Sequence, residues 1–256
     1  MNYNIKTDGK FNYIEEGEGP TIVLLHGLFG ALSNFAHVLD YFTPKMKVCI
    51  PLLPLFDLPL NETSVIGMVK HIEEFLEKRG YDDVIVLGNS LGGHIALLFT
   101  LQNMDKVRTM VLTGSSGLFE SALGDTYPKK SDYTYIKDKT EYTFYDPKTA
   151  TKALVDEVYE IVNNRNKAIR VIYLAKSAMR HNLKDDLPKI TTNTLLIWGK
   201  NDRITPPFVA EEFLKQLPNA QLDFINQCGH AAMMEKPDEF NKHLEDFLVK
   251  HNIIKP

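Results

Sequence analysis

Near-continuous apolar runs alternate with helical patterns along most of this chain, and this alternation strongly limits the folds that it can adopt. Strands that are apolar on both sides are typical of a parallel sheet whose two faces are both covered. Strands that alternate with helices favour a mostly parallel α/β architecture. The runs predicted to be strands are "TIVLLH" (21–26), "KVCI" (47–50), "DVIVLG" (83–88), "RTMVLTG" (108–114), "NTLLIWG" (193–199) and the weaker, alternating "AQLDFI" (220–225).

Three segments outside these runs have the apolar spacing of amphipathic helices. The first begins on a cap that is either Thr63 or Ser64, and it ends at Gly80. These helices are suited to covering the faces of the predicted sheet. The three segments are "TSVIGMVKHIEEFLEKRG" (63–80), "PPFVAEEFLKQLPN" (206–219) and "KPDEFNKHLEDFLVKH" (236–251).

The alternation of strand and helix breaks once, between about residues 118 and 188. The segment 127–147 is charged and rich in tyrosine, and the segment 148–182 has helical spacing without a strand. Such a length exceeds an ordinary connection between elements. We therefore predict a helical cap at 118–188, inserted into a core made of residues 1–117 and 189–256.

Composition excludes several classes of protein. With 256 residues and a net charge of −4, the chain is long enough for one large domain with an insertion, and it has no basic stripe for nucleic acid. Its start, "MNYNIKTDGK", lacks the apolar region of a signal peptide, and no apolar run approaches the ~20 residues of a membrane span. Cys49 and Cys228 have no partner in a CxxC or metal-ligand pattern. We expect a soluble cytoplasmic protein with unpaired thiols.

One serine, Ser90 in "GNSLGG", stands where a predicted strand (83–88) meets a predicted helix (91–101). Gly88 and Gly92 suit a sharp, crowded turn in which the serine itself needs a positive φ. Such a turn lifts the hydroxyl clear of the sheet and places a helix N-terminus beneath developing negative charge. The pattern indicates a nucleophile, although a plain strand-to-helix turn has the same composition.

A serine nucleophile needs a base and a carboxylate that orients the base. Asp202 follows the strand 193–199, and His230 follows the strand 220–225. Both therefore lie at carboxyl ends of strands, on the edge where open α/β sheets build their sites. Taken alone, Asp202 fits a turn or helix cap and His230 fits a loop histidine. The chain order serine, aspartate, histidine favours a catalytic triad instead.

The loop "LLHGLFGALSNF" after the strand 21–26 completes the predicted site. It is able to place a backbone N–H, that of Leu28, opposite the N–H of Leu91, and two such donors form an oxyanion hole. His26 is also a candidate base. Because His230 fills that role better, we interpret His26 as a structural residue that holds the loop.

At these residues the sequence resembles the α/β-hydrolase fold superfamily. The resemblance covers nearly the whole chain through "HGLFG", "GNSLGG", "WGKNDRITP" and "GHAAMMEKPDEF". It implies an eight-stranded, mostly parallel sheet with flanking helices and a variable cap. It also implies Ser90 as nucleophile, His230 as general base and then acid, Asp202 as the residue that holds the imidazole, and Leu28 and Leu91 as oxyanion donors.

The resemblance divides between two branches of that superfamily. "HGLFGALSNF" is similar to small bacterial acyl esterases, whereas the carboxyl half resembles meta-cleavage-product hydrolases, which split C–C bonds in vinylogous diketo acids. Asn89 and the cap residue Arg165 match positions that the second branch uses, although they also fit a polar turn residue and a solvated helix residue. Leu28-Phe29 and Ala231 depart from that branch, and Phe29 is a candidate substrate contact.

The sequence thus predicts a serine hydrolase that cleaves small carboxylic esters through an acyl-enzyme. No metal ion or organic cofactor is required, and the partner is a small-molecule ester or related carbonyl compound. Two alternatives remain: a C–C bond hydrolase of vinylogous diketo acids, and a small-molecule receptor whose triad turns over slowly.

Overall fold

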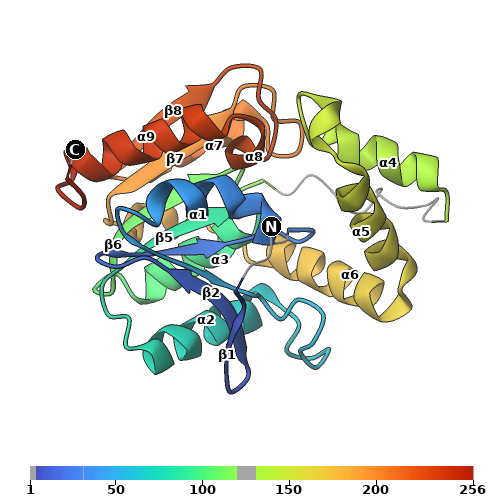
Figure 1. The fold of residues 1–256 in the computed structure, drawn as a ribbon, viewed down its shortest axis with the longest axis horizontal. Coiled ribbons are helices and arrows are strands. Elements are labelled where there is room, and N and C mark those ends of the chain that lie inside the picture. The colour runs from blue at the N-terminus through green and yellow to red at the C-terminus, as the bar shows by residue number, and fades with distance from the viewer. Residues whose placement is uncertain (1–3, 31, 120–130, 256) are drawn as a thin grey trace.

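The computed structural model describes residues 4–30, 32–119 and 131–255, and an eight-stranded sheet runs through its centre (Figure 1). The strand order is β1-β2-β4-β3-β5-β6-β7-β8. β2 pairs antiparallel with β1 and β4, and the remaining pairs are parallel. The strands are β1 (Lys6–Asp8), β2 (Phe11–Glu16), β3 (Thr21–Leu25), β4 (Lys47–Pro51), β5 (Val84–Asn89), β6 (Val107–Thr113), β7 (Thr194–Gly199) and β8 (Ala220–Ile225).

The predicted mostly parallel sheet is confirmed, and each predicted strand lies within a residue or two of its expected position. The hairpin β1–β2 was not indicated by its own residues. Its exposed and buried positions are mixed, because it forms the edge of the sheet, whereas every residue of β3, β5 and β7 is buried. An edge strand with one solvated side carries a weaker apolar signal than a central strand.

Helices cover both faces of the sheet, as Figure 1 shows. Alternate residues of the central strands point to opposite faces, so Val23 and Leu25 of β3 pack in one apolar cluster and Ile22 and Leu24 in the other. The first cluster includes residues of α2 (Val65–Arg79), α3 (Leu91–Gln102) and α7 (Pro207–Gln216). The second includes residues of α1 (Ala36–Phe42), α8 (Ala232–Glu235) and α9 (Pro237–Lys250).

The ends of α2 follow from its sequence. The N–H of Gly67 donates to the hydroxyl of Ser64 at 3.0 Å, so Ser64 rather than Thr63 is the N-cap. Gly80 closes the helix with a φ of 66°, a left-handed conformation that glycine adopts readily. None of the helices in the described residues is long and apolar enough to cross a membrane.

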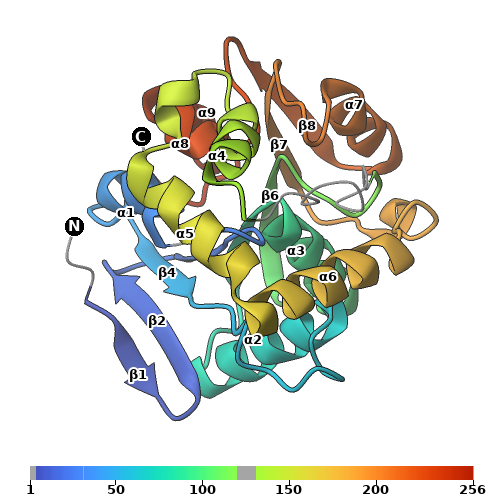
Figure 2. The same ribbon diagram turned by 90° about the vertical axis from the view of Figure 1, so that its right-hand side faces the viewer.

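Between β6 and β7 the described chain is helical, as predicted for 148–182. Asp132, Thr151 and Asn164 cap the three helices by accepting backbone N–H groups. These helices lie together at one side of the molecule (Figure 2), and residues 120–130 of the predicted cap lie outside the described residues. They are α4 (Tyr133–Tyr142), α5 (Lys152–Asn163) and α6 (Arg165–Arg180), and short 3-10 turns occur at Leu32–Phe35, Pro147–Thr149 and Leu187–Lys189.

Candidate active site

Ser90 occupies a strained turn between β5 and α3. Its φ of 55° is positive, a conformation that costs energy for a residue with a side chain. The N–H of Ser90 donates to the carbonyl of Thr113 at 3.2 Å, and its own carbonyl accepts from the N–H of Gly93 at 3.0 Å and of Ser116 at 3.2 Å. These bonds hold the turn against the end of β6 and keep the hydroxyl in a fixed position.

The two glycines beside Ser90 are required by close backbone contacts. A Cβ on Gly88 would lie 2.3 Å from the carbonyl oxygen of Gly92. A Cβ on Gly92 would lie 1.9 Å from the carbonyl oxygen of Leu25 in β3. Only glycine at both positions therefore lets α3 begin directly above the sheet, which explains why "GNSLGG" has its spacing.

Asp202 and His230 are brought together although they follow different strands. The Nδ1–H of His230 donates to Oδ2 of Asp202 at 2.9 Å, and both side chains are buried. Asp202 also accepts the N–H of Ile204 at 2.8 Å and the N–H of Thr205 at 2.9 Å through Oδ1, and the hydroxyl of Thr205 at 2.8 Å through Oδ2. The carboxylate is thus held in one orientation, and it fixes the tautomer of the imidazole.

Contacts from two other segments hold the backbone of His230. Its N–H donates to the carbonyl of Thr143, just after α4, at 3.0 Å. Its carbonyl accepts from Nδ2 of Asn89 at 3.2 Å, and the same amide donates to the carbonyl of Thr113 at 3.0 Å. Asn89, expected as a possible substrate contact, therefore joins the ends of β5 and β6 to the histidine.

Glu235 extends this support from α8. Its carboxylate accepts the N–H of Gly229 at 2.7 Å, of Tyr145 at 2.7 Å and of Asp146 at 3.3 Å. Burial raises its pKa, although the three backbone donors oppose that effect. One side chain therefore ties the loop before His230 to the chain that connects α4 and α5.

Leu28 and Leu91, the two expected oxyanion donors, line the same cavity. Leu91 is the first residue of α3, so its N–H has no acceptor within the helix. The N–H groups of Leu28 and Leu91 have no hydrogen-bond acceptor among the described residues. Two N–H donors at the wall of a cavity are able to stabilise an oxyanion.

Both ring nitrogens of His26 are engaged, one within its own loop and the other by the chain that follows β4. Its Nδ1–H donates to the carbonyl of Gly27 at 3.0 Å, and its Nε2 accepts the N–H of Leu53 at 3.3 Å. Burial lowers its pKa, and an imidazole whose Nε2 accepts an N–H carries a proton on Nδ1 alone. This environment supports the expected structural role of His26.

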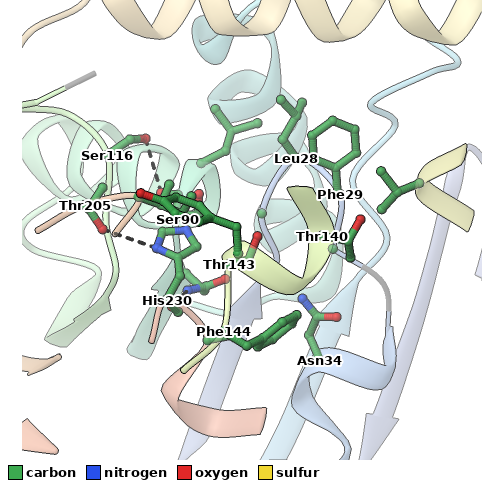
Figure 3. A pocket seen from close by; sticks show the side chains of 18 of the residues that line it. Leu28, Phe29, Asn34, Ser90, Ser116, Thr140, Thr143, Phe144, Thr205 and His230 are labelled. Atoms are coloured by element: carbon green, nitrogen blue, oxygen red, sulfur yellow. Dashed lines mark hydrogen bonds between the residues drawn. The ribbon is translucent and has the colours of Figure 1, made fainter. Parts of the chain in front are cut away.

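Ser90, His230 and the oxyanion candidates line one cavity of about 390 Å³ (Figure 3). The wall is apolar at Phe29, Phe144 and Val158, and it is polar at Asn34 and Thr140. The predicted contacts Phe29 and Asn89 line the cavity, whereas Arg165, the exposed first residue of α6, does not. Ser90, His230, Leu28 and Leu91 therefore all lie at the wall of one cavity.

A comparison with models of protein families decides the family. The model described as "Alpha/beta hydrolase family" matches residues 22–243. The chain belongs to the alpha/beta hydrolase family. The predicted resemblance is thereby confirmed, and the molecule is a hydrolase of α/β fold.

Relatives of this alpha/beta hydrolase differ in their reactions. A 2-hydroxy-6-oxononadienedioate/2-hydroxy-6-oxononatrienedioate hydrolase of Cupriavidus pinatubonensis is 30% identical over 94% of this chain and 91% of its own length. Monoacylglycerol lipase ABHD6 of Mus musculus is 25% identical over 92% and 78%, respectively. A solved structure of MGS-MChE2, an alpha/beta hydrolase enzyme from a lagoon-sediment metagenome, is 47% identical with a TM-score of 0.82, and the match covers 97% of this chain and 99% of the other.

Several residues of this hydrolase's site were missed from the sequence. Thr205 stands three residues after Asp202, and its hydroxyl donates to the aspartate. A threonine at this spacing in "NDRITP" was a signal that the turn itself holds the carboxylate. Thr143 bonds to His230 and Glu235 bonds to Tyr145 across long stretches of the chain, so local pattern gave no signal for them. Lys139 and Arg203 also line the cavity and had been left unassigned.

Proposed function

We propose that this alpha/beta hydrolase is a serine hydrolase that cleaves small carboxylic esters through an acyl-enzyme. The observation that carries the proposal is the bond of 2.9 Å between Nδ1 of His230 and Oδ2 of Asp202, at a cavity that Ser90 also lines from a strained turn. A nucleophile, its base and the carboxylate that orients the base account for a serine, a histidine and an aspartate at the ends of three strands.

In this mechanism Ser90 Oγ attacks the ester carbonyl while Nε2 of His230 takes its proton. Asp202 holds the imidazole through Nδ1 and stabilises the imidazolium that forms. The N–H groups of Leu28 and Leu91 receive the oxyanion, and one such donor is worth roughly 3 kcal/mol of barrier. His230 then protonates the departing alcohol, and a water activated by the same imidazole hydrolyses the acyl-enzyme. This chemistry requires neither a metal ion nor an organic cofactor.

A second candidate, hydrolysis of a C–C bond in a vinylogous diketo acid, is favoured by the relative that acts on 2-hydroxy-6-oxo dienedioates. Two features of the site argue for the ester. The side-chain amide of Asn89 donates to the carbonyls of Thr113 and His230, so it is already engaged within the protein. Arg165, the cap arginine expected to bind the acid, is exposed and does not line the cavity.

The test compares wild-type enzyme with Ser90→Ala. We expect wild type to react with a fluorophosphonate probe and to hydrolyse p-nitrophenyl acyl esters continuously after any burst. Ser90→Ala should lose the label and several orders of magnitude in turnover, because triad residues act as a unit. A variant that is still labelled and active would refute the proposed nucleophile. A burst without steady turnover would indicate a receptor instead.

The same assay includes a vinylogous diketo acid. We expect slow turnover of this compound, and we expect Arg165→Ala to change ester hydrolysis by less than about tenfold, which is ~1.4 kcal/mol in the barrier. Fast cleavage of the diketo acid that is lost in Arg165→Ala would assign the protein to the C–C hydrolases.

A further inference from the structure

We propose that the cavity selects esters that carry a carboxylate, and that Lys139 and Arg203 bind this carboxylate. The inference rests on the proposed function, because it names the class of ester that Ser90 attacks. It concerns two cations whose positions come from different parts of the chain: Lys139 lies on α4, and Arg203 lies in the loop between β7 and α7.

The charges on the cavity wall are all of one sign. Lys139 and Arg203 are among the lining residues, and in the described part of the chain no aspartate or glutamate lines the cavity. The whole chain has 33 acidic and 29 basic residues, so an excess of positive charge here is opposite to the balance of the molecule. A cavity lined by cations without carboxylates attracts anions and disfavours cationic substrates.

Neither cation forms an ion pair with any residue that the structure describes. Nζ of Lys139 lies 5.7 Å from the ring centroid of Tyr135, and Cζ of Arg203 lies 5.1 Å from that of Tyr142. By contrast, Lys137 on the same helix pairs with Glu141 at 3.1 Å. Contact with an aromatic ring orients a cation without neutralising its charge, so both remain available to an anionic substrate.

Lys139 belongs to α4, and Arg203 contacts an aromatic ring of the same helix. Lys139 and Tyr142 are three residues apart on α4, so their side chains lie on the same side of the helix. Arg203 stacks on Tyr142, which itself lines the cavity. Asp202, the neighbour of Arg203 in sequence, directs its oxygens to His230, to Thr205 and to backbone N–H groups instead.

This arrangement matches the shape of a carboxylate with a hydrocarbon body. A guanidinium offers two parallel N–H groups to the two oxygens of a carboxylate, and an ammonium supplies a further donor. The apolar wall at Phe29, Leu154 and Val158 accommodates the hydrocarbon part. Arg165, which the sequence offered as a possible substrate contact, does not line the cavity, whereas Lys139 and Arg203 do.

The experiment measures kcat/KM for two matched pairs of esters near pH 7.5. One pair, 4-acetoxybenzoate and its methyl ester, places the charge on the alcohol side. The other, 4-nitrophenyl hydrogen adipate and 4-nitrophenyl methyl adipate, places it on the acyl side. We expect wild type to prefer the acid by about tenfold or more in at least one pair, a ratio that charge-assisted hydrogen bonds readily supply.

Variants test whether these two residues produce the preference. Lys139→Gln and Arg203→Gln should each lower the ratio of acid to methyl ester by about tenfold, and Arg203→Lys should retain part of it. Lys137→Gln is the matched control, because it removes the same charge from the same helix outside the cavity lining. Added salt should reduce the wild-type ratio, since the cations are exposed to solvent.

The outcomes separate the two proposals. Equal hydrolysis of acid and methyl ester in both pairs would overturn the carboxylate site and leave the ester hydrolase standing. A fall in the ratio that is as large in Lys137→Gln as in Lys139→Gln would also overturn it, because attraction would then be non-specific. Absence of fluorophosphonate labelling at Ser90, together with no hydrolysis of any ester, would instead overturn the proposed function.

Discussion

At the residue scale, Oδ2 of Asp202 decides which ring nitrogen of His230 carries the proton, because it accepts the N–H of Nδ1. Asn in place of Asp202 would present an amide of similar shape that is able to turn an N–H toward Nδ1, so the imidazole would carry its proton on the nitrogen facing Ser90. That tautomer has no lone pair for the serine proton. We expect Asp202→Asn to lower kcat by about 10³- to 10⁴-fold, and His230→Ala to lower it at least as much. Steady-state kinetics on a p-nitrophenyl ester measure both losses, and circular dichroism confirms that each variant is folded.

His26 provides the contrast, because it is also a buried histidine near Ser90. Its two ring nitrogens bond to the carbonyl of Gly27 and the N–H of Leu53. His26→Ala removes both partners, so we expect a loss of about 1–3 kcal/mol in the free energy of unfolding and less than tenfold in kcat. Urea denaturation and kinetics on the same preparation separate the two effects. A folded but inactive His26→Ala enzyme, beside an active His230→Ala enzyme, would reverse the assignment of the base.

At the scale of elements, Glu235 couples α8 to the chain that connects α4 and α5. Its carboxylate is the acceptor for the N–H groups of Gly229, Tyr145 and Asp146. Glu235→Ala removes the acceptor of these three N–H groups, so we expect the free energy of unfolding to fall by about 2 kcal/mol. Because Gly229 precedes His230, we also expect kcat to fall by about tenfold or more while KM changes less.

A conservative replacement of Glu235 shows whether this residue positions His230 or only stabilises the fold. Glu235→Gln keeps one carbonyl oxygen as acceptor, so it should restore more than half of the lost kcat. Glu211→Ala, an exposed change on α7, serves as the control and should match wild type. If Glu235→Ala lowers stability but leaves kcat intact, the carboxylate supports the fold without positioning His230.

At the scale of the whole molecule, buried histidines make stability depend on pH. Burial lowers the pKa of His94 on α3 to about 4 and that of His71 on α2 to about 4. Their ordinary pKa is near 6.5, so below that pH the unfolded chain binds protons that the folded chain does not. The stabilisation that these two neutral histidines contribute is complete above about pH 6.5, and it is lost as the pH falls toward 4.

The expected size of this effect follows from the two pKa values. Between pH 7 and pH 5, a histidine whose pKa moves from about 6.5 to about 4 loses about 2 kcal/mol of stabilisation. His94→Gln keeps a donor for the carbonyl of His181, which Nε2 of His94 contacts at 2.9 Å. Urea denaturation at both pH values should show a dependence that is smaller by about 2 kcal/mol in this variant. An unchanged dependence would mean that His94 titrates normally.

Local interactions explain what the sequence determined by itself. The continuous apolar runs could be stable only as strands buried on both faces, which predicted the mostly parallel sheet. Gly88 is required by a contact within one strand-turn-helix unit, and Gly92 is required by the close approach of the neighbouring strand β3. Because carboxyl ends of parallel strands meet at one edge, the order of Ser90, Asp202 and His230 was enough to predict that they lie close together.

The tertiary structure alone decided what lines the cavity. Arg165 on α6 and Lys139 on α4 both belong to the helices between β6 and β7, yet only Lys139 lines the cavity. Neither position has a local signature, because the direction of a side chain from an inserted helix is set by how that helix packs on distant segments. The same holds for the bond between Thr143 and His230 and for the bonds of Glu235 to Tyr145 and Asp146, which join residues about 90 positions apart. Chemistry at strand ends is therefore readable from the sequence, whereas the choice of substrate depends on long-range packing.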